Sequence, residues 1–266
     1  TYLCIVFLQI METPKEEPEM QSHTIENCYG SRKLAYMMLS GRREHGIFYI
    51  PGFMGDMTDK KPEFLNKFCK EHDFSFLRYD PTYVAKSAGS DPIEYKLIIS
   101  TWIDDALEMF NLTRGSQIIV SHSLGGLIAL HLALKHPERV TALMLLGPVY
   151  NLHEAVTTTP TDSKLMEGAS QHIGYFNILK LLRDAKQHNI QLGSSLININ
   201  CRVTIIHGEK DEIPYEFSEK LFKALASTEK TLTLIESGSH FLEDDYCLEA
   251  IKVALLDLAQ IHGKSS

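Results

Sequence analysis

One serine in the sequence has neighbours that would suit a catalytic nucleophile. Ser123 is the centre of the pentapeptide Ser-His-Ser-Leu-Gly at 121–125, which follows an apolar, β-branched run at 117–120 and precedes apolar residues at helical spacing. A strand, sharp turn and helix around such a serine are typical of a nucleophile elbow, whose strained turn holds the hydroxyl clear of the sheet edge. The usual pattern has glycine two positions before the serine, where this chain has Ser121. A serine-rich helix N-cap is the alternative interpretation.

A serine hydroxyl is a weak nucleophile at neutral pH, so it needs a general base, and the base needs an orienting acid. Two later strand ends supply these groups. Asp211 follows an apolar run at 203–207, and His240 follows another at 231–235 in a Gly/Ser turn. Taken singly, the aspartate would suit a turn or helix cap and the histidine a helix start. Their occurrence after Ser123, in the order Ser, Asp, His, favours a catalytic triad.

Acyl transfer also needs backbone N–H donors aimed at the developing oxyanion, each worth roughly 10²–10³ in rate. Leu124 is the first expected donor, because it follows the nucleophile at a helix N-terminus. Phe53 is the second, because the turn Pro51-Gly52-Phe53 follows an apolar run at 46–50. A plain Pro-Gly turn is the alternative for that stretch.

The elements that must position these residues alternate along the chain. Apolar, β-branched runs predict strands at 33–38, 46–50, 74–79, 117–120, 141–146, 203–207 and 231–235. Helical spacing predicts helices at 62–74, 97–112, 125–134, 216–225 and 243–261. This alternation predicts an α/β fold with a mainly parallel, doubly wound sheet covered on both faces. In such sheets, catalytic groups collect at the carboxyl ends of the strands.

The first part of the chain lacks this alternation. Residues 1–10 form an apolar run that is too short to cross a bilayer as a helix, and 12–20 are acidic and contain prolines. We therefore expect residues 1–32 to be an N-terminal segment, either disordered or the remnant of a targeting signal. Residues 33–262 are expected to form one domain.

A second interruption, at about 150–200, contains helical pieces, clearest at 175–186, but no convincing strand. We expect it to form a helical lid over the carboxyl ends of the strands. Six apolar side chains there would suit an acyl chain, although packing of the lid onto the sheet explains most of them more simply. They are Leu165, Met166, Tyr175, Phe176, Ile178 and Leu179.

Composition excludes several classes of function. The 266 residues carry a net charge of −8, which argues against nucleic acid or an anionic membrane as the main partner. The five cysteines are scattered without a CxxC pair, which favours a reducing compartment, and no His/Cys group has zinc spacing. We expect neither a metal nor an organic cofactor.

Four motifs together resemble the α/β-hydrolase superfamily over about residues 33–262. They are Pro51-Gly52-Phe53, the stretch 121–126, His207-Gly208-Glu209-Lys210-Asp211 and Ser239-His240. The resemblance implies the α/β-hydrolase fold with a helical lid insertion and a serine hydrolase without a cofactor. Within the superfamily, Ser-Leu-Gly-Gly at 123–126, Ile-Pro-Gly at 50–52 and Leu-Ala-Tyr at 34–36 are similar to mitochondrial palmitoyl-protein thioesterases that also hydrolyse acyl glucuronides.

This narrower resemblance implies a substrate that is a small acyl ester or an S-acylated protein. It also implies a mitochondrial protein, with a cytoplasmic one as the alternative, and we expect a monomer without stable membrane insertion. The loop 80–90 departs from the Gly-x-Gly-x-Ser run frequent in such hydrolases, since Pro81–Ser87 reads Pro-Thr-Tyr-Val-Ala-Lys-Ser.

Two other functions use the same fold. A carboxylesterase or C–C bond hydrolase would use the same triad on a small substrate, whereas dehalogenases and epoxide hydrolases would need aspartate at position 123. A non-catalytic ligand-binding protein is the remaining alternative, and the complete triad argues against it.

Overall fold

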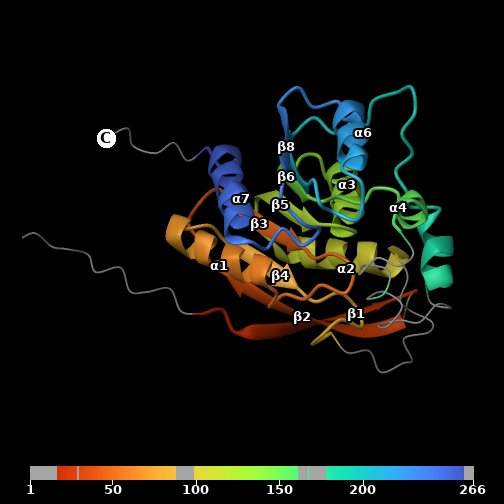
Figure 1. The fold of residues 1–266 in the computed structure, drawn as a ribbon. Coiled ribbons are helices and arrows are strands. Elements are labelled where there is room, and N and C mark those ends of the chain that lie inside the picture. Colours follow the sequence, from red (N-terminus) through yellow and green to blue (C-terminus); the bar gives the residue numbers. More distant parts are fainter. Residues whose placement is uncertain (1–16, 29, 88–98, 161–166, 168–177, 261–266) are drawn as a thin grey trace, which may run out of the picture.

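An eight-stranded sheet organises the computed structural model, in which residues 17–28, 30–87, 99–160, 167 and 178–260 are described (Figure 1). The strand order is β1-β2-β4-β3-β5-β6-β7-β8, antiparallel between β1, β2 and β4 and parallel from β4 onward. The strands are β1 (Met20–Asn27), β2 (Gly30–Leu39), β3 (His45–Ile50), β4 (Phe76–Tyr79), β5 (Ser116–His122), β6 (Val140–Leu146), β7 (Arg202–Gly208) and β8 (Lys230–Ile235). This mainly parallel α/β sheet confirms the predicted fold class.

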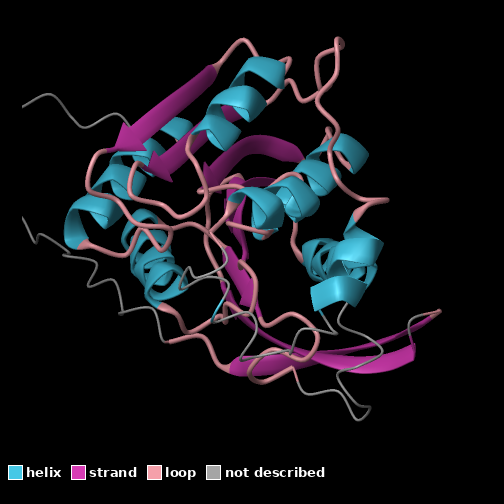
Figure 2. Ribbon diagram, turned by 45° about the vertical axis from the view of Figure 1, so that its right-hand side comes forward, coloured by secondary structure: helices cyan, strands magenta, loops and turns pink. Residues whose placement is uncertain are grey.

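Helices cover both faces of this sheet (Figure 2). They are α1 (Lys60–His72), α2 (Ile99–Leu112), α3 (Gly125–Lys135), α4 (Leu152–Thr158), α6 (Glu216–Ala224) and α7 (Asp245–Leu258), and residues 178–185 are also helical. Side chains of α1 and α7 form the core on one face, and those of α2, α3 and α6 the core on the other.

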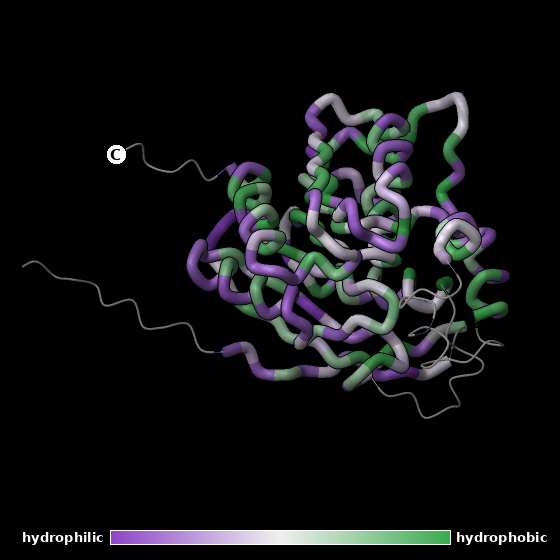
Figure 3. Tube along the Cα trace, viewed as in Figure 1, coloured by the Kyte–Doolittle hydropathy of each residue, from purple (hydrophilic) through white to green (hydrophobic). Residues whose placement is uncertain are grey.

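Alternation along the central strands explains how both faces are filled. Ile47 and Tyr49 of β3 belong to the α1/α7 core, while Phe48 and Ile50 belong to the α2/α3 core. Successive side chains of a strand point to opposite faces, so a strand buried on both sides is apolar at most of its positions. Along the Cα trace, hydrophobic segments alternate with hydrophilic ones (Figure 3).

The lid prediction is tested only in part. Residues 150–200 contain α4 and the helical residues 178–185, and among their described residues there is no strand beyond an isolated bridge from Ile197 to Leu225. Leu165, Met166, Tyr175 and Phe176 lie outside the described residues, as do the first two residues of the predicted helix 97–112. Ile178 packs into the core beside α2 and α3, whereas Leu179 is 45% exposed. No helix within the described ranges combines the length and apolar character needed to cross a bilayer.

The sheet begins before residue 33, so the predicted end of the N-terminal segment at residue 32 is wrong. Residues 20–27 form β1, which pairs along its whole length with β2, from Met20 opposite Met37 to Asn27 opposite Gly30. In β1, Ile25 is buried in the core, whereas most of the other described side chains of the strand are exposed. An edge strand is held mainly by backbone hydrogen bonds, so its side chains carry little apolar signal.

A buried ion pair joins β2 to the helix layer. Arg32, only 4% exposed, donates from Nε to Oδ1 of Asp105 at 2.7 Å and also pairs with Asp104. The other carboxylate oxygen of Asp105 accepts the Thr82 N–H at 2.8 Å, and the Trp102 indole donates to the Thr82 carbonyl at 3.2 Å. This network fixes the loop after β4 to α2.

We expect Arg32→Met to lower the free energy of unfolding by about 3–5 kcal/mol, because it leaves the Asp105 carboxylate buried without its cation. Urea unfolding followed by circular dichroism measures this loss. Lys33→Met is the matched control, since Lys33 is the exposed neighbour in the same strand. Equal stabilities for the two variants would contradict the structural role of the ion pair.

Candidate active site

The turn between β5 and α3 has the geometry of a nucleophile elbow. Ser123 adopts φ +51°, a left-handed conformation that L-residues with a Cβ rarely hold. A Cβ at Gly125 would lie 2.6 Å from the carbonyl oxygens of Ile50 and Pro51, so only glycine fits where helix and strand approach. Ser121, at the other flanking position, is fully buried, and its small side chain is accommodated there.

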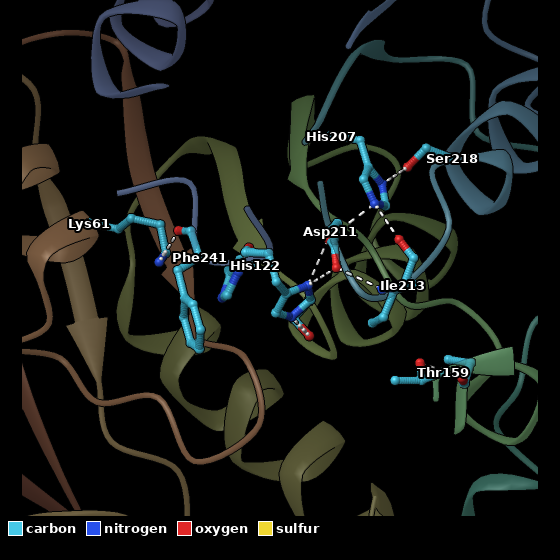
Figure 4. Close-up of polar contacts among 11 residues, drawn as sticks. Lys61, His122, Thr159, His207, Asp211, Ile213, Ser218 and Phe241 are labelled. Atoms are coloured by element: carbon cyan, nitrogen blue, oxygen red, sulfur yellow. Dashed lines mark hydrogen bonds and ion pairs between the residues drawn. The ribbon is translucent and has the colours of Figure 1, made fainter. Parts of the chain in front are cut away.

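Three predicted residues from distant parts of the chain meet at this turn. His240 Nε2 lies 2.9 Å from Ser123 Oγ, and His240 Nδ1 lies 2.9 Å from Oδ1 and 2.8 Å from Oδ2 of Asp211. Figure 4 shows Asp211 with His207 and Ile213 beside it. A neutral imidazole protonated at Nδ1 donates to the carboxylate and accepts the serine hydroxyl proton at Nε2. Gly147, at φ +49°, leaves the space this contact needs, because a Cβ there would lie 3.3 Å from Asp211 Oδ2.

A second histidine, His207, holds the other side of Asp211. Its Nε2 lies 3.0 Å from Asp211 Oδ2 and 3.0 Å from the Ile213 carbonyl, and its Nδ1 lies 2.7 Å from the Ser218 hydroxyl. The Ile213 N–H also donates to Asp211 Oδ1 at 2.8 Å. Burial alone would raise the pKa of the aspartate, but hydrogen bonds from His207 and His240 outweigh it and lower the pKa below the ordinary value. The carboxylate is therefore held ionised.

The two predicted oxyanion donors are available beside the nucleophile. Within the described part of the chain, neither the Leu124 N–H nor the Phe53 N–H donates a hydrogen bond. Leu124 precedes the first residue of α3, and Gly52, next to Phe53, lies so close that a Cβ there would be 3.1 Å from Ser123 Cβ. The Phe53 ring packs against Trp102 with centroids 5.7 Å apart. Two free amides beside one hydroxyl suit the stabilisation of an oxyanion.

The described residues contain no group of His, Cys, Asp and Glu side chains that could hold a metal ion. Independently of that, the contacts of His240 with Ser123 and Asp211 would suit nucleophilic attack by an activated serine, with proton transfer through an imidazole.

The chain is similar to known proteins with the alpha/beta hydrolase fold. A family model described as the alpha/beta hydrolase fold matches residues 47–173. The mouse protein named palmitoyl-protein thioesterase ABHD10, mitochondrial, is 28% identical over 238 residues, which cover 85% of this chain and 78% of that protein. The human protein of the same name is 27% identical over 85% of this chain and 76% of its own.

Solved structures show the same similarity. Mouse alpha/beta hydrolase domain-containing protein 10 superposes with a TM-score of 0.76 at 25% identity, covering 90% of this chain and 98% of that one. Monoglyceride lipase from Saccharomyces cerevisiae shares the fold with a TM-score of 0.70 at 17% identity, covering 92% of this chain and 97% of the lipase.

The lowered pKa of Asp211 predicts how stability depends on pH. The folded-state pKa lies below the ordinary value of about 3.9, so the carboxylate stabilises the fold fully above that value and progressively less as the pH falls toward the folded-state pKa. We expect the free energy of unfolding of the wild type to exceed that of Asp211→Asn at pH 7, and this excess to shrink as the pH falls below about 4 toward the folded-state pKa. Urea unfolding at each pH measures it.

Asp245→Asn serves as the control, because the Asp245 side chain is fully exposed and its removal should give a small, nearly constant difference. An excess for Asp211 that stays constant across the acid range would contradict the prediction.

Proposed function

We propose that this chain, whose residues 47–173 match the model of the alpha/beta hydrolase fold, is a serine hydrolase that cleaves acyl thioesters or esters. Ser123 is the proposed nucleophile, His240 the general base and Asp211 the acid that orients the base. The observation that carries this proposal is the unbroken hydrogen-bond chain from the serine hydroxyl through the imidazole to the carboxylate.

The reaction follows from the direction of these hydrogen bonds. His240 Nε2 takes the hydroxyl proton as Ser123 Oγ attacks the acyl carbonyl carbon, and Asp211 stabilises the imidazolium that forms. The N–H groups of Leu124 and Phe53 bind the oxyanion of the tetrahedral intermediate. The imidazolium then gives its proton to the departing thiolate or alkoxide, leaving an acyl-serine. Water, activated by the same imidazole, hydrolyses this ester and restores the free hydroxyl.

The substrate proposal rests on the similarity to proteins named palmitoyl-protein thioesterase. We infer protein S-depalmitoylation, with acyl glucuronides as ester substrates, for a monomer located in mitochondria. Both leaving groups fit the mechanism, since the imidazolium can give its proton to a departing thiolate or to a departing alkoxide. A carboxylesterase or C–C bond hydrolase acting on a small substrate would use the same residues and is separated from this proposal by substrate length.

Labelling with a fluorophosphonate probe tests the nucleophile. We expect the wild type to react and Ser123→Ala to lose both labelling and esterase activity, with kcat reduced by about 10⁴–10⁶-fold. Ser121→Ala is the matched control, because Ser121 is a buried residue of β5 two positions before the nucleophile, and its hydroxyl has no hydrogen-bond partner among the described residues. A folded wild type that resists the probe would contradict the hydrolase proposal and favour a ligand-binding protein.

A panel of p-nitrophenyl esters and acyl thioesters of graded chain length tests the substrate. For a depalmitoylase we expect kcat/KM to rise with length up to palmitoyl, by at most about fourfold per methylene, since burying a CH₂ is worth about 0.8 kcal/mol. A preference for acetyl over palmitoyl would contradict the depalmitoylase proposal while leaving the serine hydrolase in place.

A further inference from the structure

The residue directly before the nucleophile touches the backbone of the proposed base. His122 Nε2 lies 2.9 Å from the carbonyl oxygen of His240, and the two imidazole centroids are 5.0 Å apart (Figure 4). Ser123, the next residue, contacts the side chain of the same histidine. Two consecutive residues of the elbow therefore hold His240, one at its backbone and one at its ring.

The other ring nitrogen of His122 faces the turn that carries the second oxyanion donor. A Cβ placed on Gly52 would lie 2.9 Å from His122 Nδ1, so the ring fills the space between residues 51–53 and the loop 237–243. His122 is only 7% exposed, and burial lowers its pKa well below the ordinary value, so the ring is neutral at physiological pH. A carbonyl can only accept, which places the single ring proton on Nε2.

A second buried donor holds the next carbonyl of the same loop. Lys61, 4% exposed at the start of α1, donates from Nζ to the Phe241 carbonyl at 2.7 Å and to Glu243 Oε1 at 2.8 Å. The loop 237–243, which we call the base loop, contains no strand or α-helix of its own. Its two consecutive carbonyls at 240 and 241 are thus fixed by side chains from β5 and α1.

We propose that His122 is a positioning residue for the general base. Its Nε2–H fixes the His240 carbonyl, and its ring sets the separation between the base loop and the oxyanion turn, with Lys61 as a second support. This inference rests on the proposed function, because it concerns the distance between His240 Nε2 and Ser123 Oγ. A misplacement of about 1 Å between reacting groups costs on the order of 10²-fold in rate.

The test compares His122→Ala with His122→Gln, whose amide nitrogen keeps a donor near the position of the imidazole Nε2. We expect His122→Ala to lower kcat on a p-nitrophenyl ester about 10–100-fold with KM changed less than about threefold, and His122→Gln to recover most of the loss. The second-order rate constant for fluorophosphonate labelling should fall in parallel, because it reports the activation of Ser123 directly.

His131→Ala is the matched control. His131 lies on α3, and its Nε2 is likewise 2.7 Å from a backbone carbonyl, that of His188. Its loss should reduce thermal stability but leave kcat and the labelling rate unchanged. If His122→Ala loses stability but reacts with the probe as fast as the wild type, the residue only fills space and the proposal is overturned. Equal rate losses in His122→Ala and His122→Gln would also overturn it.

If His122→Ala fails to fold, Lys61→Met provides the second variant. It removes the hydrogen bond to the Phe241 carbonyl, and we expect labelling to slow about threefold to tenfold in a folded protein. If folded Lys61→Met is labelled as fast as the wild type, the proposal that these side chains position the base loop is overturned. Failure of the proposed function gives a different result, a folded wild type that the probe does not label at all.

Discussion

The close approach of strand and helix at the elbow is the constraint on which the site depends. Ser123 at φ +51° sits between β5 and α3, and the carbonyls of residues 50 and 51 leave no room for a side chain at position 125. A left-handed conformation costs a residue with a Cβ about 1–3 kcal/mol, and it persists only where surrounding packing determines it. Here β5 lies between two apolar cores and α3 packs its inner face into one of them, which offsets that cost. The strained turn presents the hydroxyl to His240 and frees the Leu124 amide.

Burial of Asp211 shows how the same sheet edge carries a charge. An isolated carboxylate in an apolar interior would be protonated, but this one accepts hydrogen bonds from two histidines and the Ile213 amide. The lowered pKa of the aspartate follows from the two histidines, whose hydrogen bonds and charge outweigh the effect of burial. An ionised partner keeps the proton of His240 on Nδ1, which leaves Nε2 free to accept from Ser123. His207 therefore affects the site through the carboxylate, although it lies on the far side from the nucleophile.

How much the sequence could predict depends on whether a residue's partner is local. The central strands and helices were predictable from apolar spacing, and the three residues that meet at the elbow from their place after strand ends. The strand β1 could not be predicted, since polar side chains and backbone pairing leave no periodicity. His122 and Lys61 gave no signal because their partners are backbone carbonyls 118 and 180 residues away. Every residue has a backbone carbonyl, so the spacing of residue types cannot show which carbonyl a side chain will contact.

The loop after β4 has no Gly-x-Gly-x-Ser run and is fixed by its own polar side chains. Asp80 is fully buried and accepts the N–H groups of Met57 at 2.7 Å and Lys86 at 2.9 Å. The Ser87 hydroxyl donates to the Asp80 carbonyl at 2.6 Å and accepts the Ala35 N–H at 2.8 Å. A chain of hydrogen bonds thus runs from β2 to the segment that follows the oxyanion turn. Side-chain hydrogen bonds hold residues 80–87 in place, where a glycine run would provide only backbone freedom. The antiparallel edge of the sheet carries none of the proposed catalytic residues, but these hydrogen bonds join it to the loop that contains the proposed second oxyanion donor.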